Sequence, residues 1–241
     1  MTQTAGNDRL FDALDATWAP AEVVTSGPWT LRRGAGGGKR VSAATAKVPV
    51  SEDELTMAEN LMISMDQPPL FMIRGKADTL DGQLADRGYS IVDPTLLLTA
   101  PCAELAKVNP PPIAAIPGDE PLAIMAEIWA AGGIGPARLA VMRRTRGPKT
   151  YLFSRFDTDK PGGCAFVAVD GDIAMLHALE VVPMARRKGV GHNLLGRAAI
   201  WAMEQGATTF GVVTTGKNLP AQKLFTGLGM TIVDKYHYRM K

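Results

Sequence analysis

The chain has 241 residues, of which 46% are hydrophobic and 21% are charged, and its formal net charge is +2. These values are typical of a globular protein, and so small a net charge argues against a protein whose main task is to bind nucleic acid. The two cysteines are too few for a disulfide framework, and no apolar run reaches the roughly 18 residues that span a bilayer. The N-terminus also lacks the apolar core of a signal peptide. We therefore expect a cytoplasmic protein with no metal site, no membrane contact and no nucleic-acid partner.

In the first half, the residue pattern predicts a short helix near residues 10–18 and a strand at 29–33. The glycine-rich stretch 34–38, followed by Lys39, invites comparison with a phosphate-binding P-loop. The spacing of that motif is absent, so we interpret the stretch as a flexible turn. Further predicted elements are a helix that starts with a capping box at Ser51 and Glu54, a strand at 70–73, a helix at 80–84, and two strands, 89–92 and 95–98, separated by Asp93-Pro94.

The proline-rich stretch 109–118 predicts a boundary between two domains, 1–110 and 111–241. Beyond it, helical spacing and short apolar runs alternate, with an Asp170-Gly171 hairpin turn between two of the strands. The predicted elements are helices at 122–129 and 137–143, strands at 151–156, 164–169 and 173–182, a long helix beyond Gly191, a strand at 210–213, a helix at 218–225, and two strands at 230–233 and 236–239.

The two halves contain an internal repeat. The stretch 88–93 (GYSIVD) matches 229–234 (GMTIVD), and, without a gap, a helix, a strand and a short helix precede each match in the same order. This agreement predicts two copies of one fold. The expected fold class is α/β (α+β), with two tandem halves that each have a mixed, mostly antiparallel sheet flanked by helices.

The loop 186–191 (RRKGVG) is the stretch with the clearest chemistry, and the repeat places it only in the second half. It joins an apolar strand to a long helix. A glycine-bearing loop at a helix N-terminus brings several backbone N–H groups together, and the helix dipole favours an anion there. The sequence therefore predicts a phosphate-binding site in this loop.

This loop and its preceding strand (179–183, LEVVP) resemble the acetyl-CoA signature of the GNAT acetyltransferases. A second signature of that family, N-x-x-A-x-x-L-[YF]-x-x-x-G-[FM], is matched by Asn218, Ala221, Leu224, Phe225, Gly229 and Met230. The resemblance covers about residues 120–241 and extends to the first half only through the repeat. The first half is therefore similar to a degenerate copy of the same GNAT-like fold.

The resemblance implies a site for acetyl-CoA (coenzyme A). Backbone amides from Arg187 to His192 would hold the pyrophosphate, and the strand 179–181 would pair with the pantetheine arm as an added strand does. Glu180 either faces solvent, which we favour, or acts on the acceptor amine, and helix capping is an equally physical use of Asn218. The implied cofactor-binding residues are Leu179, Glu180, Val181, Arg186, Arg187, Lys188, Gly189, Val190, Gly191, His192 and Asn218.

His177 is the candidate catalytic residue. The stretch 176–179 (LHAL) resembles the strand of arylalkylamine N-acetyltransferases, in which a histidine at this position serves as a base. The alternative is a hydrogen-bonded histidine in a buried strand. Phe225 stands where the family often has a tyrosine acid, so water, Tyr236 or Tyr238 would have to protonate the leaving thiolate.

Together these features imply an acetyl-CoA-dependent N-acetyltransferase that moves an acetyl group to an amine of a small molecule or peptide. Attack would be direct, because both cysteines lie outside the motifs. The alternative is a CoA-binding regulatory or interaction protein with weak or lost transferase activity. In the first case, the N-terminal half would complete or cover the groove for the acceptor.

Overall fold

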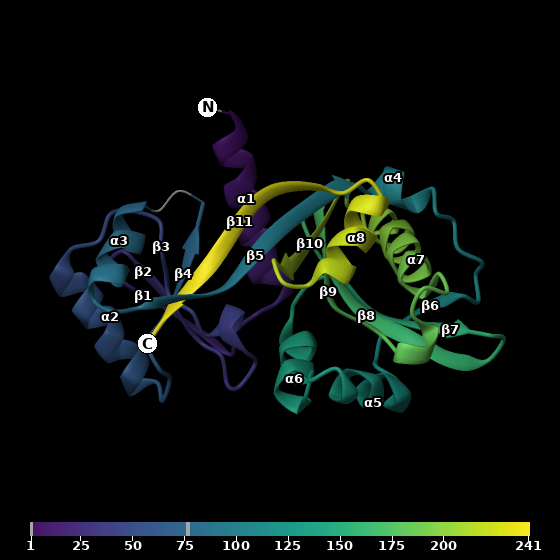
Figure 1. Cartoon of the computed structure of the whole chain (residues 1–241), viewed down its shortest axis with the longest axis horizontal. Helices are drawn as coiled ribbons and strands as arrows, with labels where there is room; N and C mark the ends of the chain where they lie inside the picture. The colour runs from purple at the N-terminus through teal and green to yellow at the C-terminus, as the bar shows by residue number, and fades with distance from the viewer. Residues whose placement is uncertain (1, 76–77) are drawn as a thin grey trace.

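A computed structural model describes residues 2–75 and 78–241 (Figure 1). The first half contains α1 (Thr2–Thr17), β1 (Glu22–Ser26), β2 (Trp29–Arg33), η1 (Lys39–Val41), β3 (Thr45–Ala46), α2 (Glu52–Ser64), β4 (Leu70–Arg74), α3 (Asp78–Asp86), β5 (Ser90–Pro101) and α4 (Cys102–Ala106). The second half contains β6 (Ala115–Gly118), α5 (Ala123–Ala131), α6 (Pro136–Arg144), β7 (Lys149–Phe156), β8 (Lys160–Asp170), β9 (Ile173–Val181), η2 (Pro183–Ala185), α7 (Val190–Glu204), β10 (Thr209–Thr215), α8 (Leu219–Gly227) and β11 (Thr231–Met240).

The strands form one sheet of eight, in the order β4-β11-β5-β10-β9-β8-β7-β6, and a second sheet of three, β1-β2-β3. The combination of helices with these two sheets confirms the α/β class. The larger sheet draws strands from both halves of the chain, so the halves do not have separate sheets. The last strand of each half pairs with a strand of the other half: β5 pairs with β10, and β11 pairs with β4. The strands β5 and β11 also pair with each other. Figure 1 shows these two long strands running through the middle of the molecule.

The order of elements repeats between the halves. The series β1-β2-β3-α2-β4-α3-β5 corresponds to β7-β8-β9-α7-β10-α8-β11. An isolated parallel bridge between Ala44 and Phe71 links β3 to β4, as parallel pairing links β9 to β10. The predicted boundary at residue 110 falls between α4 and β6, and the shared sheet crosses it. Exchange of the last strands gives backbone partners to edges that would otherwise be exposed.

Two strands that the sequence pattern divides are continuous in the structure. We expected a break at Asp93-Pro94, but β5 runs through it, and Asp93 has a positive φ of 47°. These two residues lie opposite the single residue His237, which is the arrangement of a β-bulge. A bulge accommodates the missing N–H of Pro94 without ending the strand. The matching strand β11 absorbs its own irregularity in the same way.

Local signals near helix ends are confirmed. Ser51 Oγ accepts a hydrogen bond from the backbone N–H of Glu54, and the Glu54 carboxylate accepts one from the backbone N–H of Ser51, so both sides of the capping box are formed.

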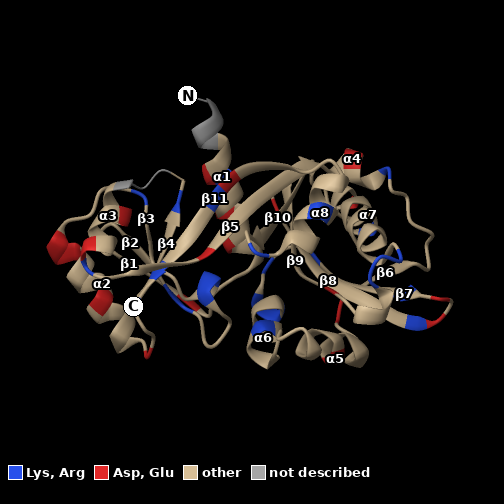
Figure 2. Cartoon of the chain, in the orientation of Figure 1, with Lys and Arg blue, Asp and Glu red and all other residues tan. Residues whose placement is uncertain are grey.

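Acidic residues gather on α2 and basic residues on α6 (Figure 2). None of the helices that the structure describes combines the length and apolar character that crossing a membrane requires.

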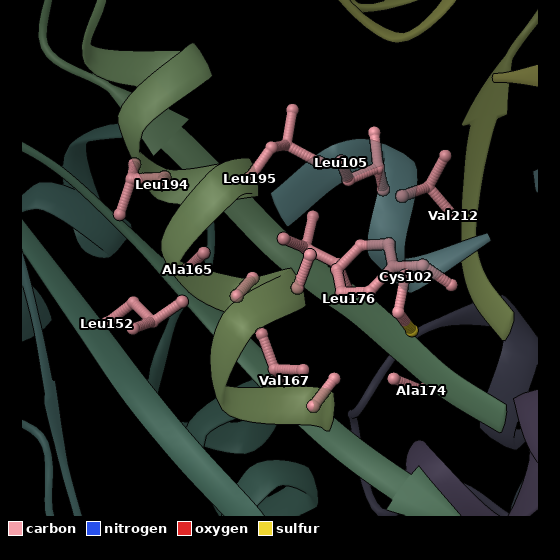
Figure 3. Close-up of a cluster of buried hydrophobic side chains, with 14 of the residues drawn as sticks. Cys102, Leu105, Leu152, Ala165, Val167, Ala174, Leu176, Leu194, Leu195 and Val212 are labelled. Atoms are coloured by element: carbon pink, nitrogen blue, oxygen red, sulfur yellow. The ribbon is translucent and has the colours of Figure 1, made fainter. Parts of the chain in front are cut away.

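The main core lies between α7 and the face of β8 and β9. Figure 3 shows Leu194 and Leu195 of α7 above Ala165, Val167 and Leu176 of the sheet. Small residues on α7, including Ala198 and Ala199, allow the helix to pack close to the strands. This packing fixes the start of α7 at the end of β9, which positions the site described below.

Replacing Leu194 with alanine is expected to lower the free energy of unfolding by about 2–5 kcal/mol, because the side chain is fully buried and the change leaves a cavity. Urea denaturation followed by circular dichroism would measure it. The matched control is Ile63→Ala on α2, where the side chain is 59% exposed and a change within about 0.5 kcal/mol is expected. Equal effects at the two positions would contradict this account of the core.

Candidate active site

The strands β9 and β10 separate at the centre of the large sheet. Their parallel pairing ends at Leu176 and Val212, after which β10 continues beside β5 as far as Thr215. Within the described strands, nothing pairs with the end of β9 on this side. A bulge at this point helps to turn β9 away: Ala178 has a positive φ of 50°, and its carbonyl accepts a hydrogen bond of 2.7 Å from Trp129 Nε1.

A groove of about 1070 Å³ lies where these strands separate. The end of β9, the loop that begins α7 and the first turns of α8 line it. All the residues that the sequence implied for cofactor binding line this groove, with the exception of Lys188, whose Nζ lies 4.9 Å above the Phe156 ring. Sequence reasoning missed Lys223 of α8, a basic residue inside the second motif that also lines the groove.

The loop places free backbone donors at one end of the groove. The first helical hydrogen bond of α7 runs from the amide of Asn193 to the carbonyl of Gly189, at 2.9 Å. In the described part of the chain, the amides of Val190, Gly191 and His192 therefore have no helical acceptor, and no side chain caps the helix. Gly189 has a φ of 82°, a left-handed conformation that glycine adopts without strain. Such an end can bind an anionic group.

Two residues near the groove have structural partners of their own. Asn218 Oδ1 accepts a hydrogen bond of 3.2 Å from the amide of Ala221, so the side chain caps α8. Glu180, which we expected to face solvent, is half-buried and packs against Gly132. Burial raises the pKa of the Glu180 carboxyl, and Arg186 opposes this shift.

His177 lies one residue before the bulge and is 4% exposed. Its Nδ1 lies 3.1 Å from Arg40 Nη1, and its Nε2 lies 2.9 Å from Thr17 Oγ1. Because a guanidinium can only donate, Nδ1 is the acceptor and Nε2 carries the proton. That proton is donated to Thr17, whose hydroxyl donates in turn to the carbonyl of Ala13 at 2.6 Å. Both ring nitrogens are therefore hydrogen-bonded.

Comparison with known proteins adds to this geometry. Residues 124–230 match the model of the acetyltransferase (GNAT) family. These residues are a GNAT acetyltransferase domain. The GNAT domain contains α5 to α8, the bulged strand β9, the loop 186–191 and the separation of β9 from β10.

Other proteins are similar to this chain over both of its halves, beyond the GNAT domain. An uncharacterized N-acetyltransferase, YobR of Bacillus subtilis (strain 168), is 26% identical over 235 residues, which cover 94% of this chain and 95% of that protein. A GCN5-related N-acetyltransferase from Kribbella flavida superimposes with a TM-score of 0.72 at 19% identity, over 97% of this chain and 94% of that one. A tandem GNAT protein from the clavulanic acid biosynthesis pathway gives a TM-score of 0.64 at 14% identity, over 93% and 84%. The structural likeness therefore extends over both halves of the chain.

Within the GNAT domain, Phe225 is buried in the core, and its side chain has no proton to donate. Tyr236 and Tyr238, the alternatives named from the sequence, line a separate cavity beside His177. Burial raises the pKa of Tyr238 well above its ordinary value. The thiols are poor nucleophiles, because both are buried and burial raises the pKa of Cys102 to about 11 and raises that of Cys164 further still.

Burial, and then the charge of Arg40, lower the pKa of His177 well below its ordinary value of 6.5. At pH values at which this histidine takes up a proton in the unfolded chain, the folded protein keeps the ring neutral. The unfolded state therefore binds more protons below about pH 6.5, and stability falls as pH falls.

We expect the unfolding free energy of the wild type to fall below pH 6.5 more steeply than that of His177→Asn, by at most about 1.4 kcal/mol per pH unit. Parallel denaturation series between pH 5 and pH 8 would measure the difference. Superimposable slopes would show that the ring titrates normally.

Proposed function

We propose that the protein is an acetyl-CoA-dependent N-acetyltransferase that acts by direct attack of an amine on the thioester. The observation that carries the proposal is the groove of about 1070 Å³, which joins unpaired helix amides at one end to an unpaired strand edge at the other. One ligand class needs both features: a long molecule with a phosphate group and an amide-bearing arm. Coenzyme A has this chemistry.

The residues fit the cofactor in three places. The amides of 190–192 would donate to its pyrophosphate, with the helix dipole and the exposed cations Arg186 and Arg187 adding favourable charge. The edge 179–181 would pair with the amides of the pantetheine arm. Bound acetyl-CoA supplies an acetyl group activated as a thioester.

The transfer forms a bond between the amine nitrogen and the acetyl carbon and breaks the bond between that carbon and sulfur. The nitrogen gives up a proton, and the thiolate gains one. His177 remains our candidate base. Its Nδ1 lone pair accepts a hydrogen bond from Arg40 Nη1, so it can take up a proton only when Arg40 Nη1 moves away. Direct attack agrees with the inert, buried thiols of Cys102 and Cys164.

The second candidate is a CoA-binding regulatory or interaction protein whose transferase activity is weak or lost. Two observations favour it. Phe225 cannot act as the acid, and both nitrogens of His177 are hydrogen-bonded. Cofactor binding is common to both candidates, so only turnover separates them.

The test measures thiol release from acetyl-CoA with a panel of primary amines, together with mass spectrometry of the products. An acetyl group that replaces hydrogen adds about 42 mass units to an amine. The appearance of such a product in proportion to the thiol released supports the acetyltransferase. Tight CoA binding by calorimetry without turnover of any amine favours the regulatory candidate. Failure to bind CoA would exclude both.

A further inference from the structure

A second cavity, about 260 Å³ in volume, adjoins the cofactor groove along β9. The cavity takes His177 and Ala178 of this strand, and the groove takes the strand from Leu179 onward. A molecule in the cavity would therefore lie next to the start of the open strand edge. The volume lies just below the range of about 300–1,000 Å³ that is typical of sites for drug-sized ligands, and it suits an amine of about amino-acid size.

Both halves of the chain build this cavity. Trp18, the stretch 37–40 and Asp93 of β5 come from the first half, while α6, β9, β10 and β11 contribute from the second. Gly37 and Gly38, from the glycine-rich stretch that we interpreted from the sequence as a flexible turn, thus line this cavity. Gly38 has a φ of 98°, a conformation that favours glycine, and η1 begins directly after it with Lys39 and Arg40.

The charges that line the cavity do not balance. Lys39 Nζ forms an ion pair of 2.9 Å with Asp93 Oδ2, so these two charges offset each other. Arg40 and Arg138 remain, and no carboxylate among the described residues forms an ion pair with Arg40. The cavity therefore has an excess of positive charge.

Asp15, a carboxylate outside the cavity whose charge acts on Arg40, does not supply the missing charge. Asp15 already forms ion pairs with Arg32, at 2.7 Å, and with Arg74, at 2.6 Å. These two cations hold the pKa of Asp15 below its ordinary value, against the opposing effect of burial, which is the largest single influence. Asp15 is thus occupied on both carboxylate oxygens.

Arg40 is held in place but is not fully hydrogen-bonded. Its Nη1 donates to His177 Nδ1 at 3.1 Å, and its guanidinium lies 5.7 Å from the centre of the Trp18 ring. Its Nε is buried, and it has no hydrogen-bond partner in the described part of the chain. A buried donor without an acceptor is unfavourable, and a charge-assisted hydrogen bond from the guanidinium to an anion would offset this cost.

We propose that the acceptor is a small amine that also carries an anionic group, a carboxylate or a phosphate, and that the Arg40 guanidinium binds this group. The inference rests on the proposed function, because it names the acceptor of the same site. The planar guanidinium matches both anions, which can each accept two parallel N–H bonds. With the anion on Arg40, the amine end would reach towards Ala178 and the open edge of β9.

The same contact bears on His177. An anion that draws the guanidinium towards itself competes with Nδ1 for the N–H groups of Arg40. Movement of Nη1 away from the ring would leave the Nδ1 lone pair open to the proton of the attacking amine. The acceptor would then prepare the base that deprotonates it.

The test uses matched amine pairs that differ only in the anion: an α-amino acid and its carboxamide, and phosphoethanolamine and ethanolamine. Turnover is followed by thiol release, and binding of each amine to the CoA-loaded protein is followed by calorimetry, which needs no turnover. The variants are Arg40→Gln and Arg40→Lys, each checked by its melting temperature. The matched control is Arg143→Gln on α6, an exposed arginine outside the cavity.

We expect the anionic member of at least one pair to have a kcat/KM about tenfold higher or more, the value of a strong charge-assisted contact. Arg40→Gln should remove this preference without changing CoA affinity, Arg40→Lys should keep part of it, and Arg143→Gln should match the wild type. Which pair responds distinguishes a carboxylate from a phosphate.

A preference for the neutral amines, or an anion preference that survives in Arg40→Gln, would overturn the acceptor inference and leave the acetyltransferase intact. If no amine turns over but an anionic amine binds the wild type and not Arg40→Gln, the inference holds and the proposed function fails. If no anionic amine binds or reacts, the inference is overturned.

Discussion

Replacing Gly191 with glutamate is expected to weaken coenzyme A binding by about 100-fold or more, measured by calorimetry with the full chain. The new carboxylate would stand among the amides of 190–192, where the cofactor pyrophosphate is expected, and like charges in contact cost several kcal/mol. A hundredfold loss corresponds to about 2.7 kcal/mol. The position is also tight, because a Cβ at Gly191 would lie 2.8 Å from Leu224 Cδ2 of α8.

Two further variants separate charge from packing. Gly191→Ala adds the Cβ without the charge and should lose much less affinity, since Leu224 has a flexible side chain that can move. Gly227→Glu makes the same chemical change at the last residue of α8, where an added Cβ meets nothing within 4 Å, and should bind CoA as the wild type does. Unaltered CoA binding by a folded Gly191→Glu protein would exclude this loop as the anion site.

Replacing His177 with alanine is expected to lower kcat at neutral pH by about 100-fold and to leave CoA affinity unchanged. A general base contributes about 10²–10⁴-fold to a rate, and His177 is absent from the residues that line the cofactor groove. The informative partner is His177→Asn, whose side-chain oxygen can still accept a hydrogen bond from Arg40 but cannot take up a proton at neutral pH.

If His177 is the base, the asparagine variant should be as slow as the alanine variant, with most of the loss in kcat. If asparagine instead restores the rate, and the alanine loss lies in the KM of the acceptor, His177 is a positioning residue that holds Arg40. Wild-type turnover in both variants would remove His177 from the mechanism. The melting temperatures of both variants are needed, because Thr17 Oγ1 loses its hydrogen bond from His177 Nε2 in each.

Most of the strands and helices could be predicted because their signals are local. The capping box at Ser51, the hairpin turn at Asp170-Gly171 and the glycine loop before α7 depend on neighbouring residues alone. The strand β5 was wrongly divided because Asp93-Pro94 resembles a strand end, and β11 was wrongly divided between residues 233 and 236. Whether a bulge continues depends on the partner strand, and β11 lies more than 130 residues away in the sequence (231 to 240 against 90 to 101).

Part of the candidate site could be predicted from local spacing in the sequence, and part could not. The residues of the cofactor groove lie within two short stretches, so their spacing could carry the prediction. The neighbours of His177 could not be found by spacing, because Thr17 and Arg40 are separated from it by 160 and 137 positions. The glycine-rich stretch 34–38 gave no signal that it would face the acceptor cavity.

The sequence by itself determined the GNAT-type loop, the order of most helices and strands, and the repeat, because each of these is recorded in local spacing and in similarity between two stretches. Only the tertiary structure decided that the halves exchange their last strands, that Arg40 occupies the lone pair of His177, and that the cavity beside it is positively charged. Strand pairing, burial and charge balance are properties of residues brought together from distant parts of the chain.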